Sequence, residues 1–180
     1  MNFILPVISK QEAQQIFSKR KVFFRRSPGE IVKLELIHFP YYTFEVTAKT
    51  KKGEQKVSIS VDGISGTFAF LNLDKVTISE EGAGSFDFEF SFEEAEKIGK
   101  REYKGVILQS GLLAKTPSEL KEIRKTYEIY YPFWVCYYKK RNLYDFSALD
   151  AVNGKIEGVK MKPVFLKAFS QKGGLKDDKN

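Results

Sequence analysis

Side chains that commonly carry catalytic chemistry are scarce in this sequence. His38 is the single histidine and Cys136 the single cysteine among 180 residues. A Ser-His or Cys-His mechanism would therefore have to use His38, and Cys136 is the one possible thiol nucleophile. Both stand in apolar, strand-like stretches, and a cysteine in a strand is most often a small buried hydrophobic residue. Nothing in the sequence brings the two side chains within hydrogen-bond reach. We therefore predict a protein that is not an enzyme and has no catalytic residues.

Two aspartates recur in the same local pattern and raise the question of a metal site. Asp62 is followed four residues later by Gly66, and Asp150 by Gly154, with a new strand-like segment after each glycine. A calcium loop needs several alternating oxygen ligands. An aspartate before a tight turn instead accepts hydrogen bonds from backbone amides, and glycine supplies the positive φ. Because the sequence also lacks a Cys/His cluster for zinc and a glycine-rich phosphate loop, we expect two turns, no metal site and no cofactor.

An aromatic run at 130–138 is the most unusual segment. On a strand, Tyr130, Trp134 and Tyr138 would share one face, and Tyr42 stands in the corresponding aromatic segment of the first half. Both faces of the run are apolar or aromatic, which suits a core strand covered on both sides. Tyr and Trp also favour partly exposed grooves and dimer surfaces. Core and partner-binding surface stay open as alternatives, and we name these four residues as binding candidates.

Positive charge offers a second candidate surface. The chain has 30 Lys and Arg residues against 23 Asp and Glu, a formal net charge of +7, which favours an acidic partner such as nucleic acid. The acidic residues are mixed among the basic ones, however, and a basic run at a helix end is often only a solvated terminus. The alternative is a basic rim made by separate loops. Its candidate residues are Arg25, Arg26, Lys139, Lys140 and Arg141.

The elements that would position these side chains include two similar helix starts. Ser9 with Glu12, and Ser91 with Glu94, match the Ser-x-x-Glu pattern of a capping box, in which the side chains bond to unpaired amides of the first turn. Each start is followed by a Pro-aromatic-aromatic segment, a strand that ends on aspartate, and the Asp-x-x-x-Gly turn. Four features in the same order indicate related segments at about 9–72 and 91–162.

This order predicts an α+β protein of two repeated units, each a helix packed on an antiparallel β-sheet. Consecutive strands joined by short turns pair antiparallel, and the helix covers one face. We place the first helix-plus-sheet unit at 1–80 and the second at 81–170. A Thr-Pro-Ser-Glu start at 116–119 predicts a helix inserted in the second unit. The polar residues 171–180 predict a flexible tail.

The matched helix starts and turns resemble PepSY-like domains. That family has a Ser-x-x-Glu-Ala-x-x-Ile type of helix start, followed by strands with an Asp-x-x-x-Gly hairpin. The corresponding residues here are Ser9, Glu12, Ala13, Ile16, Asp62 and Gly66, then Ser91, Glu94, Ala95, Ile98, Asp150 and Gly154. The resemblance implies a cystatin-like helix-on-sheet fold and a non-catalytic binding or inhibitory role. The Pro-aromatic-aromatic segment is not part of the family pattern, and PepSY domains usually belong to secreted or membrane proteins.

Location and partners are the remaining expectations. A single cysteine suits a reducing compartment. The apolar start at 1–8 is too short for a membrane span and lacks the basic region of a signal peptide. We therefore expect a cytoplasmic protein without a membrane span. We expect it to act as a binding or regulatory module for a protein or peptide partner; nucleic acid bound by the basic rim, and a homodimer, are alternatives.

Overall fold

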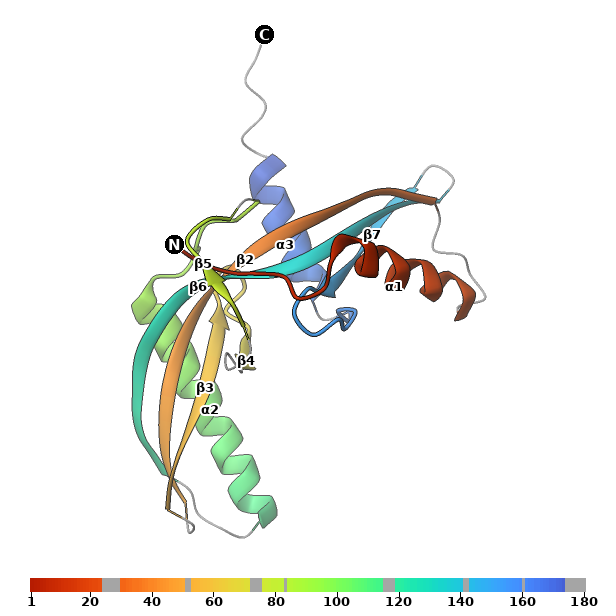
Figure 1. The fold of residues 1–180 in the computed structure, drawn as a ribbon. Helices are drawn as coiled ribbons and strands as arrows, with labels where there is room; N and C mark the ends of the chain where they lie inside the picture. The colour runs from red at the N-terminus through yellow and green to blue at the C-terminus, as the bar shows by residue number, and fades with distance from the viewer. Residues whose placement is uncertain are drawn as a thin grey trace. The chain divides into compact units, whose positions relative to one another are not determined.

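A computed structural model describes most of the chain, and one β-sheet dominates it (Figure 1). The described residues are 1–23, 30–50, 53–71, 76–82, 84–114, 119–140, 143–159 and 161–173. Within them the elements follow in the order β1 (Asn2–Ile4), α1 (Lys10–Phe23), β2 (Glu30–Thr50), β3 (Gly53–Asp62), β4 (Phe68–Phe70), β5 (Ile78–Ser79), α2 (Phe92–Ala114), β6 (Glu119–Lys140), β7 (Leu143–Asp150) and α3 (Lys162–Gly173).

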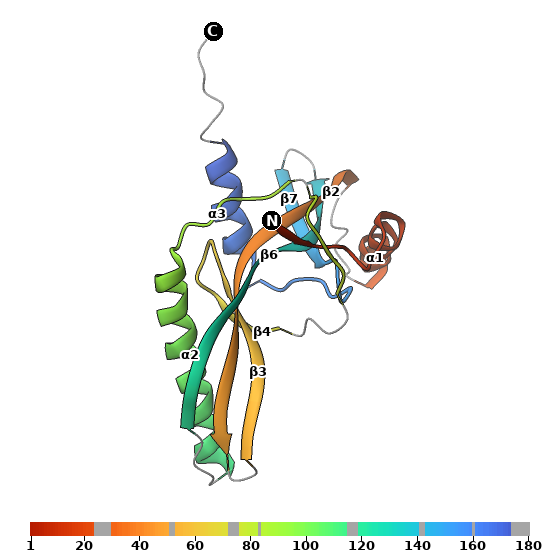
Figure 2. The same ribbon diagram turned by 60° about the vertical axis from the view of Figure 1, so that its left-hand side comes forward.

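The sheet topology corrects the predicted fold class. The seven strands form one mixed sheet in the order β4-β3-β2-β6-β1-β5, with β7 also paired to β6. The prediction of two repeated, cystatin-like helix-on-sheet units is therefore wrong, because β2 and β6, expected in separate units, are hydrogen-bonded neighbours in this sheet (Figures 1 and 2). These strands are 21 and 22 residues long. Each has backbone N–H and C=O groups along two edges, and those groups favour strand partners on both sides.

The inserted helix is a second correction. Residues 115–118 lie outside the described part of the chain, and Glu119 begins β6 instead of continuing a helix. A helix from that start would include Leu120 and Ile123, but both are strand residues that pack against the core of buried residues. Helix-start signals of this kind act over a single turn, and pairing within a sheet overrides them.

Two compact units make up the chain, and both are discontinuous in sequence. The first consists of Met1–Asn2, Pro40–Lys75 and Asp87–Tyr130, and the second of Phe3–Phe39, Val76–Phe86 and Tyr131–Asn180. In the first unit, α2 packs on one face of the sheet (Figure 2). Tyr42, Phe44 and Val46 of β2 point to this helix because residues two apart share a strand face. The buried core they form also contains Ala48, Ile59, Val61, Ala95 and Tyr103.

In the second unit, two helices pack on opposite faces of β6. Trp134 and Cys136 belong to a core on the α1 side, together with Ala13, Phe17, Tyr138, Leu149 and Ala151. Phe133 points the other way, and its ring centroid lies 5.4 Å from that of Phe165 in α3. Successive strand residues face opposite sides of a sheet, so the aromatic run of β6 is covered on both faces.

The predicted helix starts are confirmed. The amide N–H of Ser9 donates to the Glu12 carboxylate (2.8 Å), and the amide N–H of Glu12 donates to Ser9 Oγ (3.3 Å). The same reciprocal pair joins Ser91 and Glu94, at 2.8 and 3.3 Å. These bonds satisfy amides that the first turn of a helix leaves unpaired, and α1 and α2 begin one residue after each serine.

The two aspartate turns are also confirmed, and their backbone geometry is the same. Asp62 Oδ1 accepts the amides of the residues two and three positions on, both at 2.7 Å. Asp150 Oδ1 accepts the equivalent amides at 2.8 and 3.0 Å. Each turn closes with a glycine amide donating to the aspartate carbonyl at 2.9 Å, and these glycines, Gly66 and Gly154, have φ of 70° and 74°.

Candidate functional site

The four aromatic candidates lie in the interior of the protein. Trp134 is 8% exposed, and Tyr42, Tyr130 and Tyr138 are also buried. The indole N–H of Trp134 donates to the carbonyl of Ile8 (2.7 Å). Tyr42 and Tyr130 belong to the first compact unit and the other two to the second. Of the two alternatives for the aromatic run, the buried core is the one observed; a binding role for these residues stays a prediction.

The basic candidates are mostly outside the described residues. Arg25, Arg26 and Arg141 fall there, and so does the side chain of Lys140, although its backbone ends β6. Lys139 is exposed, and its Nζ lies 5.6 Å from the ring centroid of Tyr144. The basic rim therefore also stays a prediction.

His38 and Cys136 are both buried. The His38 ring packs edge-on against Phe3, with centroids 5.2 Å apart. Cys136 is fully buried in the core beside α1. Within the described residues, no group of three or more His, Cys, Asp or Glu side chains could hold a metal ion.

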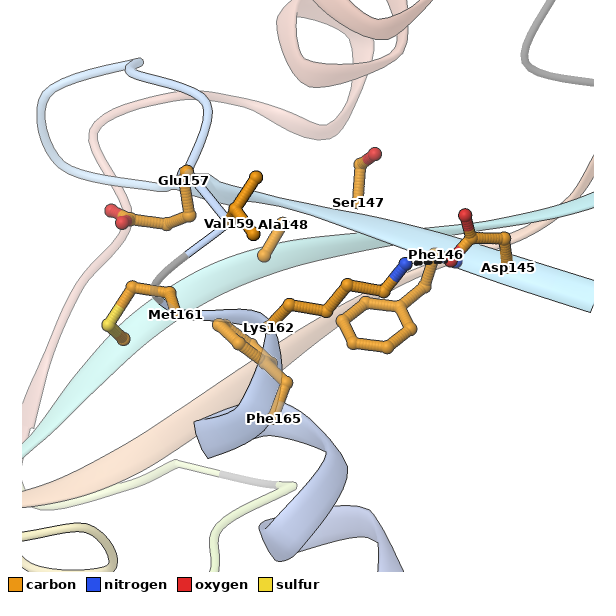
Figure 3. Close-up of a pocket in the computed structure, with 10 residues that line it drawn as sticks. Asp145, Phe146, Ser147, Ala148, Glu157, Val159, Met161, Lys162 and Phe165 are labelled. Carbon is orange, nitrogen blue, oxygen red and sulfur yellow. Dashed lines mark hydrogen bonds and ion pairs between the residues drawn. The ribbon is translucent and has the colours of Figure 1, made fainter.

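A pocket of about 260 Å³ opens in the second unit between β7, the segment 157–159 and the start of α3 (Figure 3). Its apolar lining comes from Phe146, Ala148, Val159, Met161 and Phe165. Val159 is 86% exposed beside it, so an apolar side chain faces water at the rim. The volume is that of a site for one side chain or a small ligand, below the usual range of drug-sized pockets.

The pocket lies where the segment after the second aspartate turn stops pairing with β7. The equivalent segment after the first turn, β4, stays paired with its neighbouring strand for longer. After the first turn, β4 pairs with β3 over three residues, and the amide of Leu71 then donates to the carbonyl of Ser58 (3.1 Å). After the second turn, the chain makes one bridge, Leu149 with Ile156. Its last backbone hydrogen bond to β7 among the described residues runs from the Glu157 amide to the Ala148 carbonyl (2.9 Å). The chain then leaves the edge, and the pocket lies where pairing stops.

The outer edge of β7 is consequently open from Leu143 to Phe146. No other described strand pairs with this edge. In an antiparallel ladder the groups that face outward alternate along the strand. Because the Ala148 carbonyl faces Glu157, the N–H and C=O groups of Phe146 and Tyr144 also face outward.

A charged pair covers part of this edge. The Phe146 amide donates to Oδ1 of Asp145 (2.8 Å), and Nζ of Lys162 donates to the same oxygen (2.5 Å). Figure 3 shows the Lys162 side chain reaching along the Phe146 ring toward Asp145. Burial alone would raise the pKa of Asp145, but Lys162 and the Phe146 amide outweigh it and lower that pKa below its ordinary value.

The opposite end of the pocket carries a second carboxylate. Glu157 lies with Met161 on the side away from Asp145 (Figure 3). Burial, and then the negative charge of Asp150, raise the pKa of Glu157 above its ordinary value. Asp150 in turn accepts the Tyr131 hydroxyl at 3.0 Å. The site is thus an apolar pocket with charged ends beside an unpaired strand edge.

The sequence did contain signals for the helix that completes this site. Pro163 stands at the second position of α3, and proline favours the first turn of a helix. Val164, Phe165, Ala168 and Phe169 then follow at helical spacing. Lys162 and Phe165 were missed because the second predicted unit gave this segment no element. Asp145 was missed because its role depends on the open edge of β7, and the sequence did not show which strand edges lack a partner.

Comparisons with known proteins found no match. No family model matches the chain, and no curated protein or solved structure matches it either, so the PepSY-like resemblance stays a prediction.

None of the helices in the described residues has the length and apolar character needed to cross a membrane.

Proposed function

We propose that the protein is a non-catalytic binding module that holds an extended peptide segment of a partner protein by strand addition to β7. The observation that carries this proposal is the open outer edge of β7 beside the 260 Å³ pocket. In strand addition, backbone hydrogen bonds supply affinity and a pocket for one side chain supplies specificity. We place this activity in the cytoplasm, where the single thiol of Cys136 would stay reduced.

The chemistry of the pocket supports binding more than catalysis. Asp145 is engaged with Lys162 and the Phe146 amide, so its carboxylate is neither a free base nor a proton donor at neutral pH. The apolar walls suit an aliphatic or aromatic side chain of the partner. Each backbone hydrogen bond contributes about 1 kcal/mol net, and burial of one apolar side chain about 2 kcal/mol. Three or four bonds and one side chain sum to about 5–6 kcal/mol before the entropy cost of association, so the Kd should be no tighter than about 100 µM.

A blocked pocket tests the proposal. A Cβ added at Gly158 meets nothing within 4 Å, and this glycine does not have a positive φ. Gly158→Tyr should therefore fill the mouth of the pocket without straining the fold. Gly105→Tyr is the matched control, because Gly105 is an exposed glycine of α2 with the same open surroundings and is not part of the pocket lining.

The measurement is retention of fluorescent protein on beads that carry random octapeptides. Half the beads should be attached through the peptide N-terminus and half through the C-terminus, since multivalent display makes weak binding detectable. We expect the wild type and Gly105→Tyr to retain the same octapeptides and Gly158→Tyr to lose them. Equal retention by Gly158→Tyr would contradict the proposal. Retention of beads carrying a single-stranded oligonucleotide, with no octapeptide retained, would favour the nucleic-acid alternative.

A further inference from the structure

We infer that the segment bound at β7 is the free C-terminus of its partner chain, with the terminal carboxylate replacing the Asp145 carboxylate at the Phe146 amide. This inference rests on the strand addition proposed above. It adds the chemical class of the ligand, which the open edge alone does not define.

The first step of the argument is that the bound peptide must begin or end beside the pocket. The outward-facing carbonyl of Ala148 is already bonded to the Glu157 amide. A strand added along Tyr144 and Phe146 would therefore meet the chain's own segment 155–157 if it continued past Phe146. A segment running parallel to β7 would reach this stop with its C-terminus, and an antiparallel segment with its N-terminus.

The second step is the charge at that stop. Oδ1 of Asp145 occupies a position made by one backbone amide, at 2.8 Å, and one ammonium group, at 2.5 Å. An amide and an ammonium group together are donors suited to a carboxylate. The chain has placed one of its own carboxylates there. The position therefore favours a terminal carboxylate over a terminal amine.

The third step is that the Asp145 carboxylate can be displaced at low cost. The side chains of Asp145 and Lys162 are 62% and 43% exposed. Ion pairs this exposed contribute little to stability, and Asp145 can rotate into water when a ligand arrives.

Parallel pairing also gives the last residue a second bond. In a parallel ladder, one residue of the added strand bonds to two residues of its neighbour that are two apart. The terminal residue would accept the Phe146 amide with its carboxylate and donate its own amide to the Tyr144 carbonyl. Asp145 then acts as an internal competitor for the ligand, and Lys162 as the residue that selects charge.

The test uses the octapeptide best retained on the beads, resynthesised with a fluorescent label in its middle. Four forms combine a free acid or amide C-terminus with a free or acetylated N-terminus, and fluorescence anisotropy gives each Kd. We expect the acid to bind about tenfold tighter than the amide, as a charge-assisted bond would give. Acetylation should leave the Kd unchanged. Equal Kd values for the acid and the amide would overturn this inference, and so would loss of binding when the N-terminus is acetylated. Either result would leave the proposed strand addition standing.

Variants of the charged pair extend the test. Lys162→Met should abolish the preference for the acid, and Lys97→Met, at an exposed lysine of α2, should keep it. Asp145→Ala should tighten binding of the acid, because the internal competitor is gone. A preference for the acid that survives in Lys162→Met, with circular dichroism showing a normal fold, would overturn the role of Lys162. If no octapeptide is retained by the wild type, the proposed function fails first.

Discussion

At the scale of single residues, the two aspartate turns differ in one atom's surroundings. Oδ2 of Asp150 accepts the Tyr131 hydroxyl (3.0 Å) and the Asn153 side-chain amide (2.6 Å). Oδ2 of Asp62 is buried and makes no hydrogen bond of 3.5 Å or less among the described residues. Burial raises the pKa of Asp62 above its ordinary value, against the lowering effect of the two turn amides and of the Ser65 and Tyr41 side chains. A buried charge without full hydrogen bonding is costly, so the two turns should respond differently to loss of that charge.

Asp62→Asn and Asp150→Asn test this difference as a matched pair. Asparagine keeps the Oδ1 acceptor of each turn but removes the charge. At pH 7, Asp62→Asn should leave the free energy of unfolding unchanged or raise it by up to about 1 kcal/mol. Asp150→Asn should lower it by about 1–3 kcal/mol, because the Asn153 side-chain amide loses its acceptor and the Tyr131 hydroxyl keeps only Oδ1. Urea unfolding measures both. An Asp62→Asn protein that is destabilised as much as Asp150→Asn would contradict the assignment.

The pH dependence of the same pair has a defined sign. The pKa of Asp62 is higher in the folded than in the unfolded chain, so the folded state takes up a proton more readily. Ionisation of Asp62 therefore destabilises the fold above its folded pKa, and this penalty disappears as the pH falls through that pKa toward the ordinary value. Any advantage of Asp62→Asn over the wild type should shrink on acidification. An advantage that grew toward low pH would rule out Asp62 as its source.

Gly154 gives a prediction based on backbone geometry alone. Its φ of 74° lies in the left-handed region, where a β-branched residue is strained. Gly154→Val should lower the free energy of unfolding by about 1–3 kcal/mol. Gly105→Val is the control, since Gly105 has no positive φ and open surroundings, and valine should not lower stability there. An unchanged urea midpoint for Gly154→Val would contradict the turn assignment.

At the scale of elements, the docking of α1 depends on Trp134. Its indole joins the core made with Ala13 and Phe17 of α1 and donates to the Ile8 carbonyl just before that helix. Trp134→Ala should lower the free energy of unfolding by about 3–5 kcal/mol because it leaves a large cavity. Trp134→Phe keeps most of the packing and should cost about 1–3 kcal/mol for the unpaired carbonyl.

Fluorescence measures the burial of Trp134 independently of stability, because Trp134 is the single tryptophan. Its emission should be blue-shifted and protected from iodide quenching in the folded protein. Red-shifted emission that changes on dilution would instead place Trp134 at an interface between copies of the chain.

Local signals in the sequence identified local structure and little beyond it. Ser9 and Ser91 begin helices, and Asp62 and Asp150 begin turns, because the atoms that bond lie two to four residues apart. β2 and β6 are neighbours in the sheet. The Thr43 hydroxyl of β2 donates to the Tyr127 carbonyl of β6, 84 residues away, and no motif of a few residues records this proximity. The prediction of a helix beginning at 116–119 was wrong for the same reason.

The candidate site could not be predicted from the sequence for a related reason. Phe146 was visible in the sequence only as an aromatic residue in a strand. Its importance comes from Glu157, which makes the last backbone hydrogen bond to β7 among the described residues and leaves Phe146 at an open edge. An edge is a property of pairing, and pairing was the feature that the sequence left undetermined.

At the scale of the whole molecule, two long strands contribute to both compact units. Neither unit is a continuous piece of sequence. The first needs β2, β3 and α2, which lie on either side of residue 80, and the second likewise combines α1 with β6 and β7. Separately expressed fragments 1–80 and 81–180 should therefore lack a cooperative unfolding transition, and mixing or co-expressing them should restore one.

Circular dichroism and proton NMR of each fragment measure this directly. Dispersed amide signals from either fragment alone would show that it folds independently. Such a result would support the predicted boundary near residue 80 as a domain boundary.

The early end of the strand after the second turn supplies a design for a self-inhibited protein. The first turn is followed by Thr-Phe-Ala-Phe-Leu at 67–71, which stays on its neighbouring strand throughout. Transplanting these five residues in place of 155–159 would give the second hairpin a tethered strand of its own for the edge. The backbone groups of the open edge would then be hydrogen-bonded within the molecule. The effective concentration of the tethered strand would exceed the Kd of about 100 µM expected for a free peptide. Such a chimera should fold, gain protection of the Phe146 amide against hydrogen exchange, and retain no octapeptide.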